Sequence, residues 1–436
     1  MRCRCLVLCL ALVAIARAPS AAAASALQTI APEVVKGLGA LPASPIVVAS
    51  SLATDQPAPK GDELAVRVAH LIAGKIGGTA RAYGKAETLA SARAASAKAG
   101  ALVYVQTEIA KGDLRVTADL YPSMSNAWDR IRIPTPAPRA HVFVSAPLDA
   151  EVRTFLPPVV LERATLHKSR HDEGEVLAVG CGDLDGDGGM EVALATRARV
   201  VLGHVSGGKL SLVKTAPWNL LLPRASVPLR EPLAGIVFRA PGALLVGTTE
   251  RGGVQLDSNL APVASLTGIP VPLGKDGACA RASAESQSFE GDVTACAIPA
   301  QGARPSSLAS ASVPTFDVFA HADIVQKDGT IRPVWASREP SGKLRLRYGD
   351  QVASVDAAGA QLALGDLDLD GDPEILTTSD AGEDFVLVSS WTAQGLRQRA
   401  KIPAPAGVRA LCVCPPEERG IPALVAVVGD QIWIWR

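Results

Sequence analysis

Two short acidic segments carry the side chains that are best suited to chemistry. Residues 183–191 and 366–374 both read D-x-D-x-D-G-x-x-E, with carboxylates at the first, third, fifth and ninth positions. Carboxylates that alternate along a tightly turning loop can converge on one hard cation, and glycine at the sixth position permits the turn. The repeated pattern therefore predicts one cation site in each segment.

The expected cation is calcium, which takes about six to eight oxygen ligands. Magnesium demands a stricter octahedral geometry, and transition metals usually recruit His or Cys, which neither segment contains. We expect waters to complete each shell. The predicted protein ligands are Asp183, Asp185, Asp187, the carbonyl of Gly189 and Glu191 in the first loop, and Asp366, Asp368, Asp370, the carbonyl of Asp372 and Glu374 in the second.

An EF-hand and a plain solvated turn are the alternatives to this interpretation. An EF-hand needs a bidentate glutamate at its twelfth position, where the two segments have Leu194 and Thr377. The flanking residues read as short strands rather than as amphipathic helices. Clustered Asp and Gly would explain a single turn without a metal. Two matches of this length in one chain favour metal sites, whose role we expect to be structural.

No convergent set of catalytic residues is recognisable in the sequence. A G-x-S-x-G elbow, an H-E-x-x-H pair and a phosphate-binding loop are all missing. The histidines are scattered, and His167 and His171 fall in what we expect to be a charged loop between strands. The leading hypothesis is a non-catalytic scaffold that binds a protein or an envelope polymer. The alternative is a polysaccharide lyase or hydrolase whose residues come from distant loops.

The first 26 residues are typical of a secretory signal peptide. Arg2 and Arg4 precede an apolar run over residues 6–16 and a small-residue stretch over 20–26, so we expect cleavage near residues 22–26. The apolar run is too short to span a bilayer, and no comparable run follows it. We therefore expect an exported chain, periplasmic or extracellular, with no transmembrane segment in its mature form. Its slightly acidic balance predicts no nucleic-acid partner.

The cysteines suggest one disulfide and leave three residues open. Cys279 and Cys296 lie in two strand-like stretches on either side of a polar connection, and a hairpin would bring them opposite one another. Cys412 and Cys414 share one face of a strand and should not bridge each other, so buried free thiols are expected there. The pairing of Cys181, Cys412 and Cys414 stays open.

The periodicity of the chain predicts an α+β multidomain protein. After a linker over residues 27–44, residues 45–156 alternate strands and amphipathic helices, which predicts a small α/β domain. From residue 159 to 436, short β-prone segments are separated by Gly, Pro, Asp and Ser. Similar units recur there at roughly 40–50 residues, the spacing of propeller blades. We expect a β-propeller of about six blades, within a range of five to seven.

Both acidic loops resemble the FG-GAP or VCBS repeats of integrin-type propellers and of many bacterial exported proteins. The acidic positions match that motif residue by residue, whereas its Phe-Gly and Gly-Ala-Pro parts are not evident. The resemblance implies calcium at the residues named above, in antiparallel blades around a central channel. Residues 45–123 also resemble the N-terminal α/β domain of TolB-type periplasmic proteins, which likewise precedes a propeller, one without these calcium loops.

Overall fold

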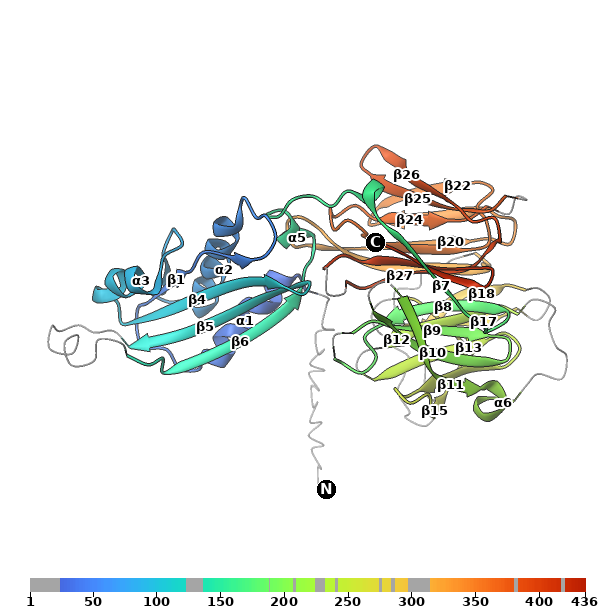
Figure 1. The fold of residues 1–436 in the computed structure, drawn as a ribbon, viewed down its shortest axis with the longest axis horizontal. Coiled ribbons are helices and arrows are strands. Elements are labelled where there is room, and N and C mark those ends of the chain that lie inside the picture. The colour runs from blue at the N-terminus through green and yellow to red at the C-terminus, as the bar shows by residue number, and fades with distance from the viewer. Residues whose placement is uncertain are drawn as a thin grey trace, which may run out of the picture.

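The computed structural model places a small α/β domain beside a ring of six β-sheets (Figure 1). It describes residues 24–122, 136–187, 189–206, 209–223, 232–239, 242–273, 277–283, 287–296, 314–379, 383–416 and 420–436. Residues 1–23 of the predicted signal peptide therefore lie outside the described residues. In the described part, no helix combines the length and the apolar character needed to cross a membrane.

The N-terminal domain is a mixed sheet of six strands with helices on both faces. The sheet order is β3-β1-β4-β5-β6, and β2 pairs with β4. Strands β1, β3 and β4 are parallel, whereas β4-β5-β6 form an antiparallel meander. The elements are α1 (Ala26–Leu38), β1 (Pro45–Ala49), β2 (Ala53–Thr54), α2 (Gly61–Ile76), β3 (Arg81–Ala82), α3 (Leu89–Ala95), β4 (Ala101–Ala110), β5 (Asp113–Pro122), β6 (Ala140–Pro147) and α5 (Ala150–Arg153).

The linker predicted over residues 27–44 is wrong for most of its length, because helix α1 occupies Ala26–Leu38. Leu27, Ile30, Val34 and Leu38 fall on one helical stripe and are buried in the same core as α2 and the sheet. Pro32 lies inside this helix and removes one backbone donor from it. Burial of the apolar stripe offsets that lost hydrogen bond, so the helix forms despite the proline.

The second domain is a six-bladed β-propeller, as the sequence predicts. Among the described residues, the third blade is the short β16-β17-β18 sheet, and the other five blades have four strands each. In order along the chain, the strands are β7 (Leu166–Arg170), β8 (Val176–Gly182), β9 (Glu191–Thr196), β10 (Arg199–Ser206), β11 (Lys209–Pro217), β12 (Ala234–Arg239), β13 (Ala243–Thr248), β14 (Gly252–Leu256), β15 (Pro262–Ser265), β16 (Ile269–Val271), β17 (Ala278–Ala282), β18 (Phe289–Ala295), β19 (Val318–Val325), β20 (Ile331–Arg338), β21 (Leu344–Tyr348), β22 (Gln351–Val355), β23 (Leu362–Gly365), β24 (Glu374–Thr377), β25 (Phe385–Thr392), β26 (Gly395–Pro403), β27 (Val408–Cys414), β28 (Ala423–Val428) and β29 (Gln431–Trp435).

Two features close the ring. Strand β7 pairs antiparallel with β29, so the first strand of the domain completes the last blade. His167 therefore lies in a strand, and the charged loop expected there is wrong; the Leu166–Arg170 segment alternates too weakly in hydrophobicity to be recognised. Cys181 of β8 and Cys414 of β27 form a disulfide that joins the first blade to the last. The free thiol expected at Cys414 is thus wrong.

Two other cysteine expectations agree with the structure. Cys279 and Cys296 are disulfide-bonded, as predicted for the ends of a hairpin. Cys412 is a free thiol, and its Sγ lies 3.3 Å from the Cys181 Sγ. Burial raises the pKa of the Cys412 thiol, which keeps it protonated and poorly nucleophilic. Four of the described cysteines therefore cross-link the propeller through two disulfides.

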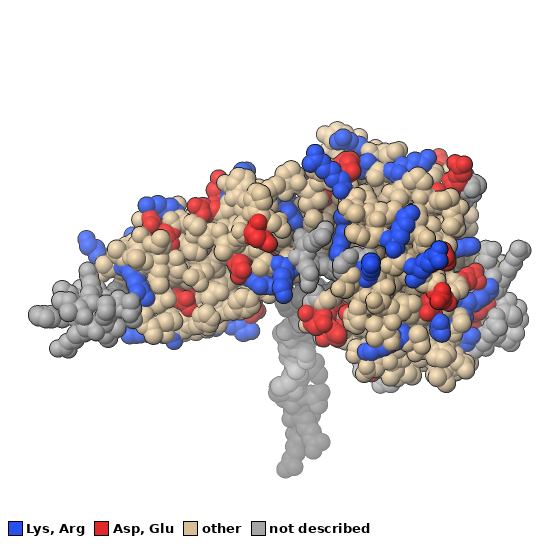
Figure 2. Space-filling model, viewed as in Figure 1, with Lys and Arg blue, Asp and Glu red and all other residues tan. Residues whose placement is uncertain are grey.

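The inner strands of the blades surround a central cavity of about 540 Å³. Its lining is mostly aliphatic and aromatic, with Asp317, His321 and Arg409 among the polar residues. The guanidinium of Arg338 forms an ion pair with Asp317. Figure 2 shows Lys and Arg interspersed with Asp and Glu over the visible face of both domains, with no broad basic field there.

Candidate metal centres

The first acidic loop connects β8 and β9 and brings three predicted ligands together. Carboxylate oxygens of Asp183, Asp185 and Glu191 lie within 4.8 Å of one another. The loop backbone donates to two of these carboxylates: the Gly186 N–H to Asp183 Oδ1 at 2.7 Å and the Leu184 N–H to Glu191 Oε2 at 2.7 Å. These hydrogen bonds turn the carboxylates inward, toward a common point.

The second loop connects β23 and β24 and repeats this arrangement. Oxygens of Asp366, Asp368 and Glu374 lie within 4.8 Å of one another. The Leu367 N–H donates to Glu374 Oε2 at 2.7 Å, the same contact that Leu184 makes with Glu191 in the first loop. Both loops therefore fold their ninth-position glutamate back onto the second residue of the motif.

The fifth-position carboxylates lie outside these two groups. Asp187 Oδ1 accepts the Gly189 N–H at 2.6 Å, and Asp370 Oδ1 accepts the Asp372 N–H at 2.9 Å. Each aspartate therefore stabilises the turn after the glycine. Direct ligation by Asp187 and Asp370, and by the carbonyls of Gly189 and Asp372, stays a prediction.

Burial makes the second loop electrostatically costly without a cation. Desolvation raises the pKa of Asp366 and of Glu374 well above their ordinary values, and neighbouring carboxylates add to the increase. Desolvation and the charge of Asp370 raise the pKa of Asp368 to about 6. In the first loop, desolvation likewise raises the pKa of Glu191. A divalent cation would reverse these penalties, because it favours the ionised carboxylates.

Each group already has one basic side chain at its edge. Arg399 Nη1 lies 3.2 Å from Asp368 Oδ2, and His204 Nδ1 lies 2.8 Å from Glu191 Oε1. In the second loop, Asp368 is buried and its other oxygen, Oδ1, has no hydrogen-bond partner in the described structure. Three carboxylates, an orphaned buried oxygen and the absence of His or Cys from both loops fit a hard, oxygen-preferring cation.

Residues far from the motif support the second loop, and the sequence pattern does not identify them. Gln326 Nε2 and Tyr348 Oη donate to the Gly371 carbonyl at 2.9 and 3.0 Å. Leu369, at the fourth position of the motif, packs in the core of the N-terminal domain. The first loop has Gly186 at that position. The apolar residue that replaces glycine in the second loop is the sequence feature that could have indicated this contact.

Comparisons with known proteins identify no family and give only distant structural matches. Protein-family models and curated protein sequences give no match. Among solved structures, the "Structure of U3-55K" is 12% identical, covering 62% of this chain and 98% of that one, with a TM-score of 0.39. The "Crystal structure of RRP9 WD40 repeats" is 13% identical, covering 62% and 96%, with a TM-score of 0.38. The "Structure of SapL1 lectin in complex with alpha methyl fucoside" is 9% identical, covering 62% and 92%, with a TM-score of 0.37.

Proposed function

We propose that this chain is an exported, calcium-binding β-propeller scaffold that presents a binding surface to a protein or a cell-envelope polymer. The observation that carries the proposal is the repeated geometry of the two acidic loops, each with three converging carboxylates and the same Leu-to-Glu hydrogen bond. The resemblance of both loops to FG-GAP or VCBS repeats supports calcium as the cation. The disulfides support an oxidising, extracytoplasmic location.

The proposed calcium ions neutralise converging carboxylates, of which Glu191, Asp368 and Glu374 are buried. Asp183, Asp185 and Glu191 would hold one ion, and Asp366, Asp368 and Glu374 the other. Glu191 begins β9 and Glu374 begins β24, so each ligand set joins a loop to the second strand of its blade. The chain's own part is to pre-orient these oxygens through backbone donors. The role is structural: it fixes the loops at one end of the first and fifth blades.

The scaffold role is supported by how the propeller is held together. Strand β7 completes the last blade, and the Cys181–Cys414 disulfide joins the last blade to the first. A ring closed in this way is a rigid platform whose loops can differ without loss of the fold. The described polar residues of the central cavity include Asp317, which is already paired with Arg338. That pairing favours a structural role for Asp317 over a catalytic one.

The test is thermal unfolding of the mature chain with calcium and with a chelator. We expect chelation to lower the melting temperature, and Asp183→Ala and Asp366→Ala each to remove part of that calcium effect. Asp257→Ala is the matched control, because Asp257 Oδ1 accepts the N–H groups of Asn259 and Ala261 in a turn outside both loops. A melting temperature that changes neither on chelation nor with the two loop substitutions would refute the calcium proposal. Turnover of an envelope polysaccharide by the purified chain would refute the non-catalytic role.

A further inference from the structure

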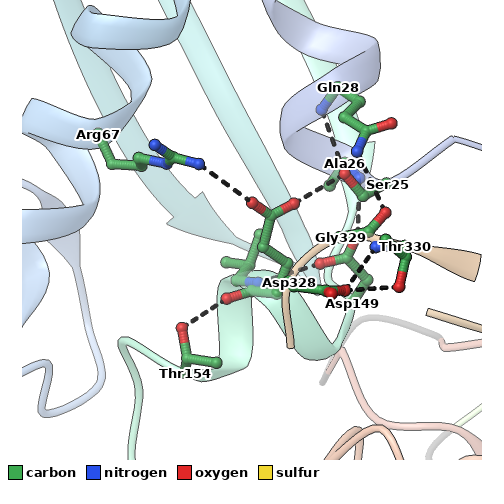
Figure 3. A network of polar contacts seen from close by, with 11 residues as sticks. Ser25, Ala26, Gln28, Arg67, Asp149, Thr154, Asp328, Gly329 and Thr330 are labelled. Atoms are coloured by element: carbon green, nitrogen blue, oxygen red, sulfur yellow. Dashed lines mark hydrogen bonds and ion pairs between the residues drawn. The ribbon is translucent and has the colours of Figure 1, made fainter. Parts of the chain in front are cut away.

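A buried acidic pair lies where helix α1 begins. Asp149 is the N-cap residue of α5, and Glu151 lies within that helix. Asp149 Oδ2 accepts the Ala26 N–H at 2.6 Å, and Glu151 Oε2 accepts the Ser25 hydroxyl at 2.7 Å. Ser25 is completely buried, whereas Ala24 is exposed. Figure 3 shows Ser25, Ala26 and Asp149 close together at the start of the helix.

The pair also touches the propeller. Gln28 Nε2 donates to the Gly329 carbonyl at 3.2 Å, in the turn between β19 and β20 (Figure 3). A methyl group placed on Gly329 would lie 2.5 Å from Glu151 Oε2, so the backbone of this turn approaches the carboxylate closely. The neighbouring Asp328 accepts the N–H and hydroxyl of Thr330. The first residues of α1 therefore lie in the contact between the two domains.

The carboxylate pair itself has little positive charge close to it. Arg67 of α2 is the one described cation within 4 Å of the pair: its Nη2 lies 4.0 Å from Glu151 Oε1, and its side chain is 53% exposed. Desolvation raises the pKa of both Asp149 and Glu151, and the charges of Asp149 and Asp328 raise that of Glu151 further. The dipole of α1 offsets only about half a charge at its N-terminus. A further cation would stabilise the contact.

We propose that the mature chain begins at Ser25 and that its α-ammonium group completes the buried Asp149–Glu151 pair. This inference rests on the export that forms part of the proposed function. Residues 22–24 are three alanines, which supply the small residues that leader cleavage before Ser25 requires. The new ammonium group would belong to Ser25, whose hydroxyl donates to Glu151. Ser25 directly precedes Ala26, whose N–H donates to Asp149.

The burial of Ser25 sets the order of events. The bond before Ser25 is attached to a completely buried residue, so a peptidase must cut it before the domain folds. A leader removed during translocation of the unfolded chain meets this condition. The ammonium group is then enclosed as α1 packs on α2 and as the propeller turn closes over Glu151. Cleavage would thus stabilise the N-terminal domain and its contact with the propeller.

The first experiment determines where the mature chain begins. The full chain, with residues 1–24 intact, is expressed in a bacterial host and recovered from the periplasm, and its intact mass and N-terminal sequence are measured. A start at Ser25 supports the proposal. A start at any other residue, or a retained leader, overturns it.

The second experiment isolates the ammonium group without changing the core. Chains beginning at Ser25 and at Ala22 are released from a cleavable fusion and melted in saturating calcium. We expect the Ser25 chain to melt about 2–4 °C higher near pH 7. An α-amino group has an ordinary pKa of about 8, which the carboxylates would raise. The added stability is present below the unfolded pKa and is lost as the pH rises through the folded pKa. Equal melting of the two chains at all pH values overturns the proposal.

Substitutions in both chains give an independent readout. Glu151→Gln and Asp149→Asn should cost more stability in the Ser25 chain than in the Ala22 chain, because only the former has the ammonium partner. Glu63→Gln in the first turn of α2 is the matched control and should affect both chains equally. Equal losses from the Glu151 and Asp149 substitutions in both chains contradict the pairing. Both chains retain the two acidic loops. Failure of the ammonium pairing can therefore be distinguished from failure of calcium binding, which is measured on the same chains.

Discussion

The two acidic loops share a motif but differ in their surroundings. Both connect the first and second strands of a blade, and both contain the same Leu-to-Glu hydrogen bond. The first loop is partly open to solvent at Asp185 and Asp187. The second is enclosed, with Asp368 and Glu374 buried. The motif thus sets the local turn, whereas the packing around it sets the cost of leaving the carboxylates without a cation.

One position explains much of the difference between the loops. The fourth residue has a left-handed backbone in both, with φ of 82° at Gly186 and 54° at Leu369. That conformation costs a non-glycine residue roughly 1–2 kcal/mol. Leu369 offsets this cost by packing in the core of the N-terminal domain, where burial of a leucine contributes about 1.5–3 kcal/mol. The second loop therefore also joins the two domains.

The largest expected effect comes from the matched substitutions Glu374→Gln and Glu191→Gln. In calcium, we expect Glu374→Gln to lower the free energy of unfolding by about 3 kcal/mol, as for a broken buried ion pair, and Glu191→Gln to cost less. In chelator at pH 7.5, Glu374→Gln should instead stabilise the chain, because it removes an uncompensated buried charge. Denaturant unfolding with calcium and with chelator measures both signs.

The pH dependence of the chelated chain has a definite sign. The folded pKa values of Asp366 and Glu374 are raised well above their unfolded values, and that of Asp368 is raised to about 6. Stability from such groups is present below the unfolded pKa and is lost as the pH rises through the folded pKa. The advantage of Glu374→Gln in chelator should therefore shrink from pH 7.5 to pH 5. A constant difference would contradict the buried-charge explanation.

A reciprocal exchange at the fourth position tests the role of Leu369. Leu369→Gly relieves the left-handed strain but removes the contact with the N-terminal domain, so we expect a net loss of about 1 kcal/mol. Gly186→Leu should cost about 1–2 kcal/mol, because it adds strain to the exposed loop. Limited proteolysis near residues 157–160 should speed up only for Leu369→Gly. Equal protection of the two variants would argue against an interdomain role for Leu369.

A comparably small loss of stability is expected for Tyr348→Phe. It removes the hydroxyl that donates to the Gly371 carbonyl in the second loop, and the expected loss is about 1 kcal/mol. Tyr104→Phe is the matched control, because that hydroxyl donates to the Glu87 carbonyl in the N-terminal domain. We expect only Tyr348→Phe to weaken calcium binding at the second loop. Titration calorimetry compares the two variants.

Local patterns predicted much of this structure. The 3.6-residue stripe predicted α2, alternation predicted the β4-β5 hairpin, and repeat spacing predicted about six blades. Helix α1 was missed because Pro32 interrupts its stripe and because the stripe follows directly on the apolar N-terminal stretch of the sequence. Strand β7 was missed because its sequence is charged and its partner β29 lies at the other end of the chain.

The candidate metal sites were predictable only in part. Motif spacing identified the residues that converge, including Asp183, Asp366 and Glu374. It could not show that Arg399 or Tyr348 supports the second loop, because these residues come from other strands. The Cys181–Cys414 disulfide depends on ring closure between the first and last blades, a contact that no local spacing encodes. Long-range pairing is thus what the sequence pattern left undetermined.

Equilibrium dialysis of the chelator-stripped mature chain against calcium tests the central claim most directly. If the chain has two structural calcium sites, the wild type should bind two ions. The Glu191→Gln and Glu374→Gln variants should each bind one ion, because each substitution removes a ligand from one site. The remaining ion should be bound more tightly when it occupies the enclosed second loop. A wild-type chain that binds no calcium would contradict the proposed role of the acidic loops. An unchanged number of bound ions in both variants would contradict it as well.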